Sequence, residues 1–315
     1  MSGLDVDTLF ESFCSSLSSE TAAAGRELAA TLGLAPNADV PWSQVFKNPV
    51  TLEAPALLCE GISGVGPTEL EKAVFAHMLS IIEAFGGDRV ADGQVADTVT
   101  LRRVLACTRA SRDDALEALG GASARSFAGE CDAQTNAAIA EEHVLLRRGE
   151  GLPIDVYRRV SAGKQAVGLP ATLALAKVAG LDARGVETVR RTLMGVWLGL
   201  QFHDDVVDWK DDLARGGAWM AALAKRRPFD APAGDAGSIE ARVLASGVLT
   251  EVLELSAESY EEAARGAELL GAQTLARWAS SRATDARAQA EGERRSPGFV
   301  GRMRKLEAWK SEVLA

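Results

Sequence analysis

The residues best suited to metal chemistry lie in one acidic segment, residues 201–212. Asp204, Asp208 and Asp212 are spaced at four-residue steps, which places them on nearly one face of an α-helix. Like charges at this spacing repel each other, and a divalent cation removes that penalty. Carboxylate oxygens suit Mg²⁺. Because the segment continues a hydrophobic stretch that begins at Leu193, we expect a partly buried metal-binding helix rather than a solvated acidic face.

A second pair of carboxylates, Asp88 and Asp92, also lies one helical turn apart. It follows an apolar stretch, residues 75–82, so it too ends a helix that should be buried. Alone, the pair is weak evidence, because this spacing occurs by chance and Gly86-Gly87 can end the helix before it. Together, the two pairs predict that carboxylates from facing helices line one cavity.

Composition and charge argue against several other classes of protein. The chain has 315 residues, of which 47% are hydrophobic, and its formal net charge is −10. Nucleic acid is an unfavourable partner for such a chain, because phosphate binding needs a basic surface. We expect no membrane span, since no apolar run approaches about 18 residues, and a cytoplasmic protein, since the first residues lack a signal-peptide pattern. The four cysteines are widely separated and only three histidines exist, so carboxylates are the expected metal ligands.

The elements that must position these carboxylates are helices, because hydrophobic residues recur at three- and four-residue steps almost throughout. Glycine pairs such as Gly120-Gly121 separate them. The predicted helices span residues 5–33, 51–62, 67–86, 97–119, 123–147, 154–180, 184–214, 238–266, 269–293 and 299–313. Ten or so helices with short connections predict an all-α fold, a single-domain bundle around a central cavity that covers residues 1–315.

Taken together, these motifs resemble those of the class I isoprenoid synthases, meaning the trans-prenyltransferases and the class I terpene synthases. Residues 200–208 are similar to the Phe-Gln-x-x-Asp-Asp-x-x-Asp motif of polyprenyl synthases, with leucine in place of phenylalanine. Residues 157–166 look like the Lys-Thr-Ala segment of the family. Gly129-Glu130 resembles the Gly-Gln or Gly-Glu on the helix before that segment, and residues 52–58 fall where the family has its Arg-Pro-x-Leu helix. Asp88–Asp92 falls where the first Asp-rich motif belongs. The resemblance spans about half the chain.

The resemblance implies an isoprenoid synthase fold and a role for each matched residue. The implied reaction is the ionisation of an allylic prenyl diphosphate, with three Mg²⁺ ions stabilising the departing diphosphate. The implied catalytic residues are Asp88, Asp92, Asp204 and Asp208, and the implied metal ligands are these four and Asp205. The implied diphosphate-binding residues are Lys164, Gln201 and Arg215. The carbocation needs a dry apolar pocket, and the expected wall residues are Phe85, Trp197 and Phe202.

One departure from the family distinguishes two reactions. Chain-elongating prenyltransferases bind isopentenyl diphosphate through a Gly-Lys-Arg-x-Arg-Pro segment, whereas residues 50–54 contain no basic residue and Glu53 would repel a phosphate. The family's Arg-Arg-Gly is also missing, and Arg102-Arg103 lie several residues late. We therefore expect a terpene synthase, in which the cation cyclises or loses a proton. The alternative, favoured by the Asp-Asp-x-x-Asp form of the second motif, is a trans-prenyltransferase.

Two further alternatives remain open. Arg89 stands where the first motif usually has another aspartate, and the chain is a non-catalytic partner subunit if the two remaining carboxylates do not bind Mg²⁺. His203-Asp204 is the doublet of HD-type metal phosphohydrolases, but such a site needs more histidines than His77 and His143 supply.

Two segments near the C-terminus could close the site. The proline-containing loop at residues 227–237 is expected to act as a lid. Arg302, Arg304 and Lys305 are expected to be surface charge, although a late helix of terpene synthases contributes an arginine to the lid. A homodimer is left open as the assembly.

Overall fold

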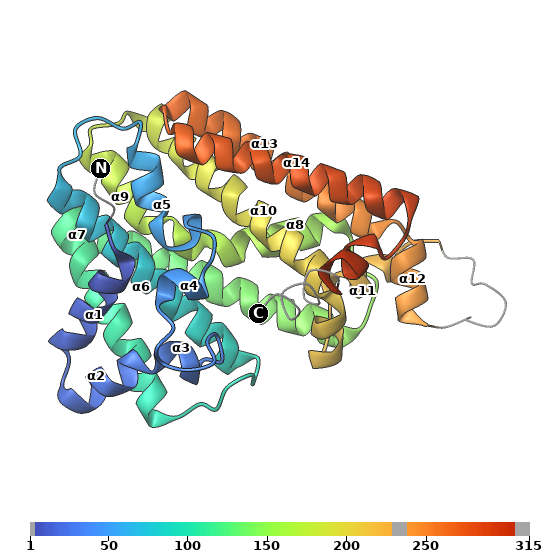
Figure 1. The fold of residues 1–315 in the computed structure, drawn as a ribbon, viewed down its shortest axis with the longest axis horizontal. Coiled ribbons are helices and arrows are strands. Elements are labelled where there is room, and N and C mark those ends of the chain that lie inside the picture. Colours follow the sequence, from blue (N-terminus) through green and yellow to red (C-terminus); the bar gives the residue numbers. More distant parts are fainter. Residues whose placement is uncertain (1–3, 229–237, 306–315) are drawn as a thin grey trace. The chain divides into compact units, whose positions relative to one another are not determined.

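The computed structural model describes residues 4–228 and 238–305, and within these ranges the chain is helical and contains no strand (Figure 1). The helices are α1 (Val6–Ser16), α2 (Ser19–Arg26), α3 (Leu28–Thr31), α4 (Trp42–Val45), α5 (Val50–Cys59), α6 (Pro67–Ala91), α7 (Val99–Arg148), α8 (Ile154–Lys164), the 3-10 helix η1 (Gln165–Gly168), α9 (Pro170–Val178), α10 (Ala183–Arg215), α11 (Trp219–Lys225), α12 (Ile239–Ala245), α13 (Val248–Leu270) and α14 (Gln273–Arg295). A last helical segment begins at residue 299. The all-α prediction is confirmed. In the part of the chain described, no helix is long and apolar enough to span a bilayer.

The described residues form two compact units, each assembled from separate stretches of sequence. The first unit contains residues 4–134, 166–193 and 266–275. The second contains residues 135–165, 194–228, 238–265 and 276–305. The single domain over residues 1–315 stays a prediction, and each unit is described by itself.

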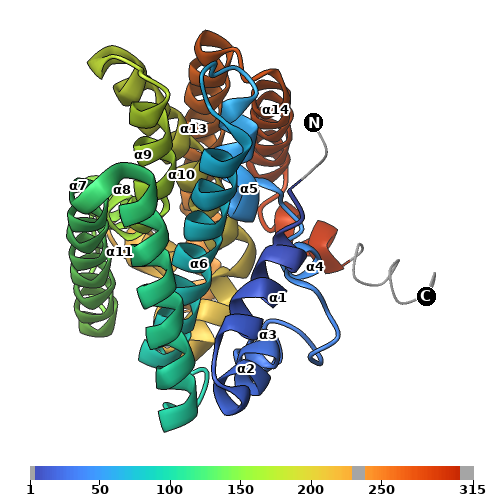
Figure 2. The ribbon, with the colours of Figure 1, turned by 90° about the vertical axis from the view of Figure 1, so that its left-hand side faces the viewer.

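The first unit is organised around α6, which packs against α1, α5 and α9 (Figure 2). Its buried side chains include Met78, Leu79 and Ile82, all fully inaccessible to solvent. Aromatic residues of α1 and α4 extend this core, since the ring centroids of Phe10 and Trp42 lie 5.3 Å apart. Burial of such side chains is the main favourable term in folding, so α6 is firmly held up to its last turns.

Helix α7 is a hairpin of two helices rather than one rod. Gly121 has a φ of +70°, which is readily available only to glycine, and Figure 2 shows the chain reversing at this turn. The reversal brings the buried Arg112 guanidinium within 2.8 Å of both Asp132 carboxylate oxygens, although the two residues are 20 positions apart. A straight helix would separate them by roughly 30 Å. The predicted break at Gly120-Gly121 is therefore confirmed.

The ionic cluster around Arg112 also accounts for a buried acid of α6. Glu83 lies 3.7 Å from Arg112 and accepts a 2.5 Å hydrogen bond from Arg109. Burial raises the pKa of the Glu83 carboxyl, and these two arginines oppose the rise. Paired charges of this kind fix the register of α6 against α7. A shift in register would separate the partners and leave a buried charge unpaired, which is strongly destabilising.

The second unit contains the end of α7, α8, α11, α12 and most of α10, α13 and α14. Within it α13 and α14 lie side by side (Figures 1 and 2), with the rings of Tyr260 and Trp278 5.6 Å apart. Ser256 of α13 donates a 2.7 Å hydrogen bond to the Gly199 carbonyl of α10. The core of this unit includes the short helix α11, of which Trp219 is 4% exposed.

Several predicted helix boundaries are wrong. Residues 5–33 form three helices: the backbone is extended at Leu17 and Ser18, between α1 and α2, and a second boundary falls at Glu27, between α2 and α3. The predicted helix over residues 154–180 is interrupted by η1, and the one over 238–266 breaks between α12 and α13. Helices α4 and α11 were not expected, since each is too short to show a periodic pattern. Residues 306–313 of the last predicted helix lie outside the described residues.

Candidate functional site

The second acidic motif occupies the C-terminal part of α10, in the second unit. One side of this helix is in the hydrophobic core, where Phe202 and Val206 are each 2% exposed. Asp204 is exposed, and Asp208 and Asp212 are partly buried. The sequence therefore positions the acidic face by burying the apolar residues between the carboxylates, as the four-residue spacing predicts.

The carboxyl groups of this face disfavour one another's charge. Loss of hydration among the surrounding protein atoms raises the pKa of Asp204 to about 6, and the charge of Asp208 adds to the rise. Loss of hydration also raises the pKa of Asp212 to about 6; Arg215 opposes the rise, and Asp208 and Asp204 add to it. A cation among these oxygens would relieve the repulsion, so the donor set fits a divalent metal.

The acidic face is not an all-protein metal cage. Over residues 4–228 and 238–305, no three His, Cys, Asp or Glu side chains are arranged to hold an ion. Mg²⁺ ordinarily keeps several waters and is held by one or two carboxylates together with substrate phosphates. The second acidic motif therefore suits a hydrated Mg²⁺ better than a tightly enclosed metal.

Asp205 differs from the aspartates on the acidic face because both of its oxygens accept hydrogen bonds from protein groups. The Tyr157 hydroxyl donates to one oxygen at 2.6 Å, and the Gln201 amide donates to the other at 2.9 Å. Gln201 in turn accepts a 3.0 Å hydrogen bond from Gln165. Burial raises the pKa of Asp205 to about 7, against the lowering effect of the Tyr157 hydrogen bond. The metal-ligand role of Asp205 and the diphosphate role of Gln201 stay predictions.

Lys164 ends α8, and its ammonium donates a 2.6 Å hydrogen bond to Glu142 of α7. The other Glu142 oxygen accepts a 2.5 Å hydrogen bond from the indole of Trp219. The charge of Lys164 lowers the pKa values of Asp204 and Asp205, so the ammonium lies within electrostatic reach of the acidic motif. Sequence reasoning missed Glu142 and Trp219, because no motif or spacing links residues 77 positions apart.

Two arginines contact the acidic face from its own unit. Arg215, expected to bind diphosphate, lies 3.2 Å from Asp212. Arg304, expected to be surface charge, forms an ion pair with Asp208 and donates a 3.2 Å hydrogen bond to the Val207 carbonyl. The last helical segment holds it there, because Val300 of that segment is buried in the core. The predicted lid falls almost entirely on residues 229–237, which lie outside the described residues.

The aromatic residues expected to line the pocket occupy different environments. Phe202 is buried against Tyr157, with ring centroids 5.2 Å apart, and Trp197 is 4% exposed. Phe85 belongs to the first unit, is 41% exposed, and contacts Phe46 at 4.9 Å. Their roles as walls of a carbocation pocket stay predictions.

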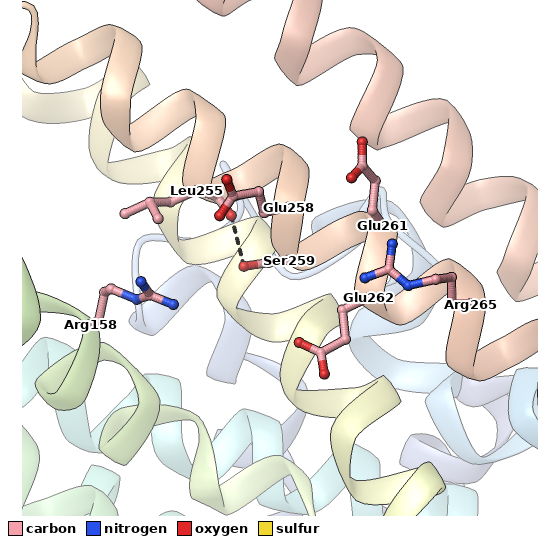
Figure 3. Close-up of a pocket in the computed structure, with 7 residues that line it drawn as sticks. All are labelled: Arg158, Leu255, Glu258, Ser259, Glu261, Glu262 and Arg265. Atoms are coloured by element: carbon pink, nitrogen blue, oxygen red, sulfur yellow. Dashed lines mark hydrogen bonds between the residues drawn. The ribbon is translucent and has the colours of Figure 1, made fainter.

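A pocket of about 290 Å³ in the second unit is a different site (Figure 3). It is lined mainly by charged side chains: Arg158, Leu255, Glu258, Ser259, Glu261, Glu262 and Arg265. None of the predicted site residues lines it. Because a carbocation needs apolar walls with few nucleophiles, this pocket does not suit the predicted chemistry.

The first acidic motif ends α6, in the first unit. Gly86 does not end this helix. The absence of a side chain at Gly86 lets α7 pack closely against α6, since a Cβ there would lie 2.5 Å from a Leu105 methyl group. Asp88 is therefore helical, and the Asp92 amide donates a 2.8 Å hydrogen bond to the Asp88 carbonyl. Arg89 donates a 2.9 Å hydrogen bond to the Leu32 carbonyl. The alignment of the two acidic motifs along one cavity stays a prediction.

The region expected to lack an isopentenyl diphosphate site is acidic in the structure. Burial raises the pKa of the Glu53 carboxyl, and the negative charges of Asp7 and Asp5 add to the rise. Of the two basic residues considered as substitutes, Arg102 pairs with Asp97 at 2.8 Å and Arg103 lies 3.3 Å from an acidic side chain of α2.

The comparisons with known proteins support the fold. No protein-family model and no curated protein sequence matches the chain. Among solved structures, it is similar to decaprenyl diphosphate synthase from Rhodobacter capsulatus, with a TM-score of 0.70 and 14% identity over 90% of this chain and 95% of that one. It is similar to heptaprenyl diphosphate synthase from Staphylococcus aureus, with a TM-score of 0.68 and 14% identity over 89% and 96% of the two chains.

A third solved structure, polyprenyl synthase from Caulobacter crescentus CB15 complexed with calcium and isoprenyl diphosphate, gives a TM-score of 0.56 and 17% identity over 89% of this chain and 99% of that one. At such identities the likeness shows the fold alone. The chain has the all-α fold of the prenyl diphosphate synthases, which confirms the fold that its motifs implied.

Proposed function

We propose that the chain is a metal-dependent enzyme that acts on an allylic prenyl diphosphate and transfers the prenyl group. The observation that carries the proposal is the acidic face of α10 with the Lys164 ammonium in electrostatic reach, on the fold of prenyl diphosphate synthases. A carboxylate face beside a cationic side chain suits a metal–diphosphate complex: the carboxylates would hold the metal, and the metal would supply positive charge to the diphosphate.

The residues of the second unit would each perform a part of this chemistry. Asp204 and Asp208 would hold a divalent metal, which when bound supplies positive charge to the departing diphosphate. The Lys164 ammonium would donate a charge-assisted hydrogen bond to a diphosphate oxygen. Arg215 would add positive charge at the end of α10. The Caulobacter polyprenyl synthase, which is complexed with calcium and isoprenyl diphosphate, supports this combination of ligands.

The comparisons favour prenyl transfer over the terpene synthase reaction expected from the sequence, because the three solved structures described above are of prenyl synthases. Mg²⁺ is the expected metal, and its number is part of the proposal. A metal-binding role for Asp88 and Asp92 of the first unit is also part of the proposal.

One observation favours a second candidate function, ionisation followed by cyclisation or proton loss. Glu53 lies near Asp5 and Asp7, and negative charges there oppose the binding of a second diphosphate. A terpene synthase needs no second diphosphate, so the negative charge of this region would not hinder its reaction.

The test is an incubation of the full chain with Mg²⁺ and, separately, geranyl, farnesyl and geranylgeranyl diphosphates, with and without radiolabelled isopentenyl diphosphate. Prenyl transfer predicts label in a longer prenyl diphosphate. Hydrocarbon or alcohol products formed without isopentenyl diphosphate would establish the second candidate instead. If the folded protein releases no diphosphate from any of these substrates, the proposed enzyme activity is wrong and the non-catalytic partner is the better account.

A further inference from the structure

Lys164 is held at both its backbone and its ammonium. The Thr135 hydroxyl contacts the Lys164 carbonyl oxygen at 3.3 Å and the preceding carbonyl, of Gly163, at 3.4 Å. The ammonium donates to Glu142 at 2.6 Å. Only 17% of the Lys164 side chain and 11% of the Glu142 side chain are exposed. The end of α8 is thus anchored to α7 by two separate contacts.

Glu142 is itself oriented by Trp219. The indole nitrogen of this buried residue donates to Glu142 Oε1, which leaves Oε2 for the Lys164 ammonium. The Trp219 ring packs 5.0 Å from the ring of Tyr157, the residue whose hydroxyl binds Asp205. Three helices, α7, α8 and α11, therefore contribute to one polar contact at the edge of the acidic motif.

Stability alone does not require this arrangement. Burying a carboxylate and an ammonium costs solvation, and well-packed apolar residues of similar volume often stabilise a fold equally well or better. A lysine side chain is flexible, and fixing it before a ligand arrives reduces the entropy that binding costs. An ammonium group carries three hydrogens and can donate to more than one acceptor, so the contact with Glu142 does not by itself prevent a hydrogen bond to a phosphate oxygen.

We propose that Glu142 and Trp219 are positioning residues that hold the Lys164 ammonium ready for the diphosphate of the substrate. This inference rests on the proposed function, because it assumes that Lys164 binds diphosphate. Glu142 and Trp219 act through Lys164 and do not touch the substrate. Without their contacts, the ammonium keeps its positive charge but is no longer held at one position.

The test uses variants that conserve charge, so that position changes and net charge does not. Trp219→Phe removes the indole donor, and Glu142→Asp shortens the carboxylate by one methylene so that it no longer reaches both partners. The matched control is Glu141→Asp, at the neighbouring residue, whose carboxylate pairs with Arg159 on the surface. Because Trp219 is buried, Glu142→Asp provides the test if Trp219→Phe does not fold.

Two measurements are made on the full chain: calorimetric binding of inorganic diphosphate with Mg²⁺, and kcat and KM with the best allylic diphosphate. We expect each positioning variant to weaken diphosphate binding several-fold and to lower kcat/KM by roughly tenfold, since misplaced charge contributes less to the transition state. The control should stay within about twofold. In a Lys164→Gln background, the positioning variants should cause no further loss, because interacting residues are not additive.

Additive losses in the Lys164→Gln background would contradict the inference, as would unchanged binding and kinetics in a folded Glu142→Asp protein. A failure of the proposed function looks different: Lys164→Gln itself would then leave the affinity for inorganic diphosphate unchanged.

Discussion

The two acidic motifs end helices of different units, and they differ in what surrounds them. The motif of α10 has a third aspartate one turn further on, a lysine in electrostatic reach, and an adjacent aspartate engaged by Tyr157 and Gln201. The motif of α6 ends at a helix cap, and its central Arg89 is bound to the Leu32 carbonyl. The same Asp-x-x-x-Asp spacing thus occurs once along a helix face whose carboxyl pKa values are raised and once at the C-terminal end of a helix. Spacing alone therefore does not distinguish the two motifs.

The largest expected effect is at the α10 face. Asp208→Asn should lower kcat/KM by roughly a hundredfold or more, because a preorganised charge that stabilises the transition state contributes this much in other enzymes. The matched control is Asp211→Asn, a neighbouring residue that is 62% exposed in its side chain and should stay within about threefold. Steady-state kinetics of both variants provide the measurement. Equal losses of kcat/KM in the two variants would show that the acidic face of α10 has no special role in catalysis.

The next effect links pH, metal and stability. Asp204, Asp205 and Asp212 have pKa values raised to about 6–7 from 3.8, so the folded state binds more protons than the unfolded chain between pH of about 4 and 7. Without metal, their contribution to the free energy of unfolding therefore falls as the pH rises through that window. Mg²⁺ binds the deprotonated form and should offset this loss above the window.

Thermal unfolding with and without Mg²⁺ at pH 5.5 and pH 8 measures this coupling. At a metal concentration of about one hundred times Kd, the stabilisation at pH 8 should approach roughly 2.7 kcal/mol. It should be much smaller at pH 5.5. An Mg²⁺ effect that is the same at both pH values would show that these carboxyls are not the metal ligands.

The first motif should respond less. Asp92→Asn is expected to lower kcat/KM by roughly tenfold, because Asp92 lies at a helix end where water already solvates its charge. Kinetics measured in parallel with Asp208→Asn decide the comparison. A loss at Asp92 as large as that at Asp208 would make the two motifs functionally equivalent.

The smallest expected effect concerns Arg304. Its guanidinium pairs with Asp208 and is 49% exposed, so the pair should contribute at most about 1 kcal/mol. Because the guanidinium competes with a cation for Asp208, Arg304→Gln should tighten Mg²⁺ binding by a few-fold, as measured by calorimetry. Weaker Mg²⁺ binding in this variant would instead place Arg304 in support of the metal complex.

Much of the fold could be predicted from the sequence, because long amphipathic segments such as α10 carry a periodic signal that burial then enforces. The break at Gly120-Gly121 was predictable for the same reason that it occurs, since glycine there adopts a positive φ. Gly86 shows the limit of this reasoning. At Gly86 a glycine continues the helix, because the absence of a side chain lets a neighbouring helix pack closely. Only the packing against Leu105 shows that this glycine does not end the helix.

The candidate site was predictable where it follows a local pattern. The aspartates of α10 are spaced by the helix itself, so their common face needed no tertiary information. The contact of Glu142 with Lys164 and Trp219 depends on three helices meeting, and nothing in the order of residues encodes that meeting locally. Arg304 was expected to be surface charge, and its pairing with Asp208 likewise depends on how the last helical segment packs.

The most direct test of the central claim is a crystal structure of the full chain grown with Mg²⁺ and inorganic diphosphate. We expect a Mg²⁺ ion within about 2.1 Å of Asp204 or Asp208 oxygens and a diphosphate oxygen within hydrogen-bond distance of the Lys164 ammonium. Metal and diphosphate bound elsewhere, with Arg304 still paired to Asp208 and Lys164 still hydrogen-bonded to Glu142, would contradict this expectation.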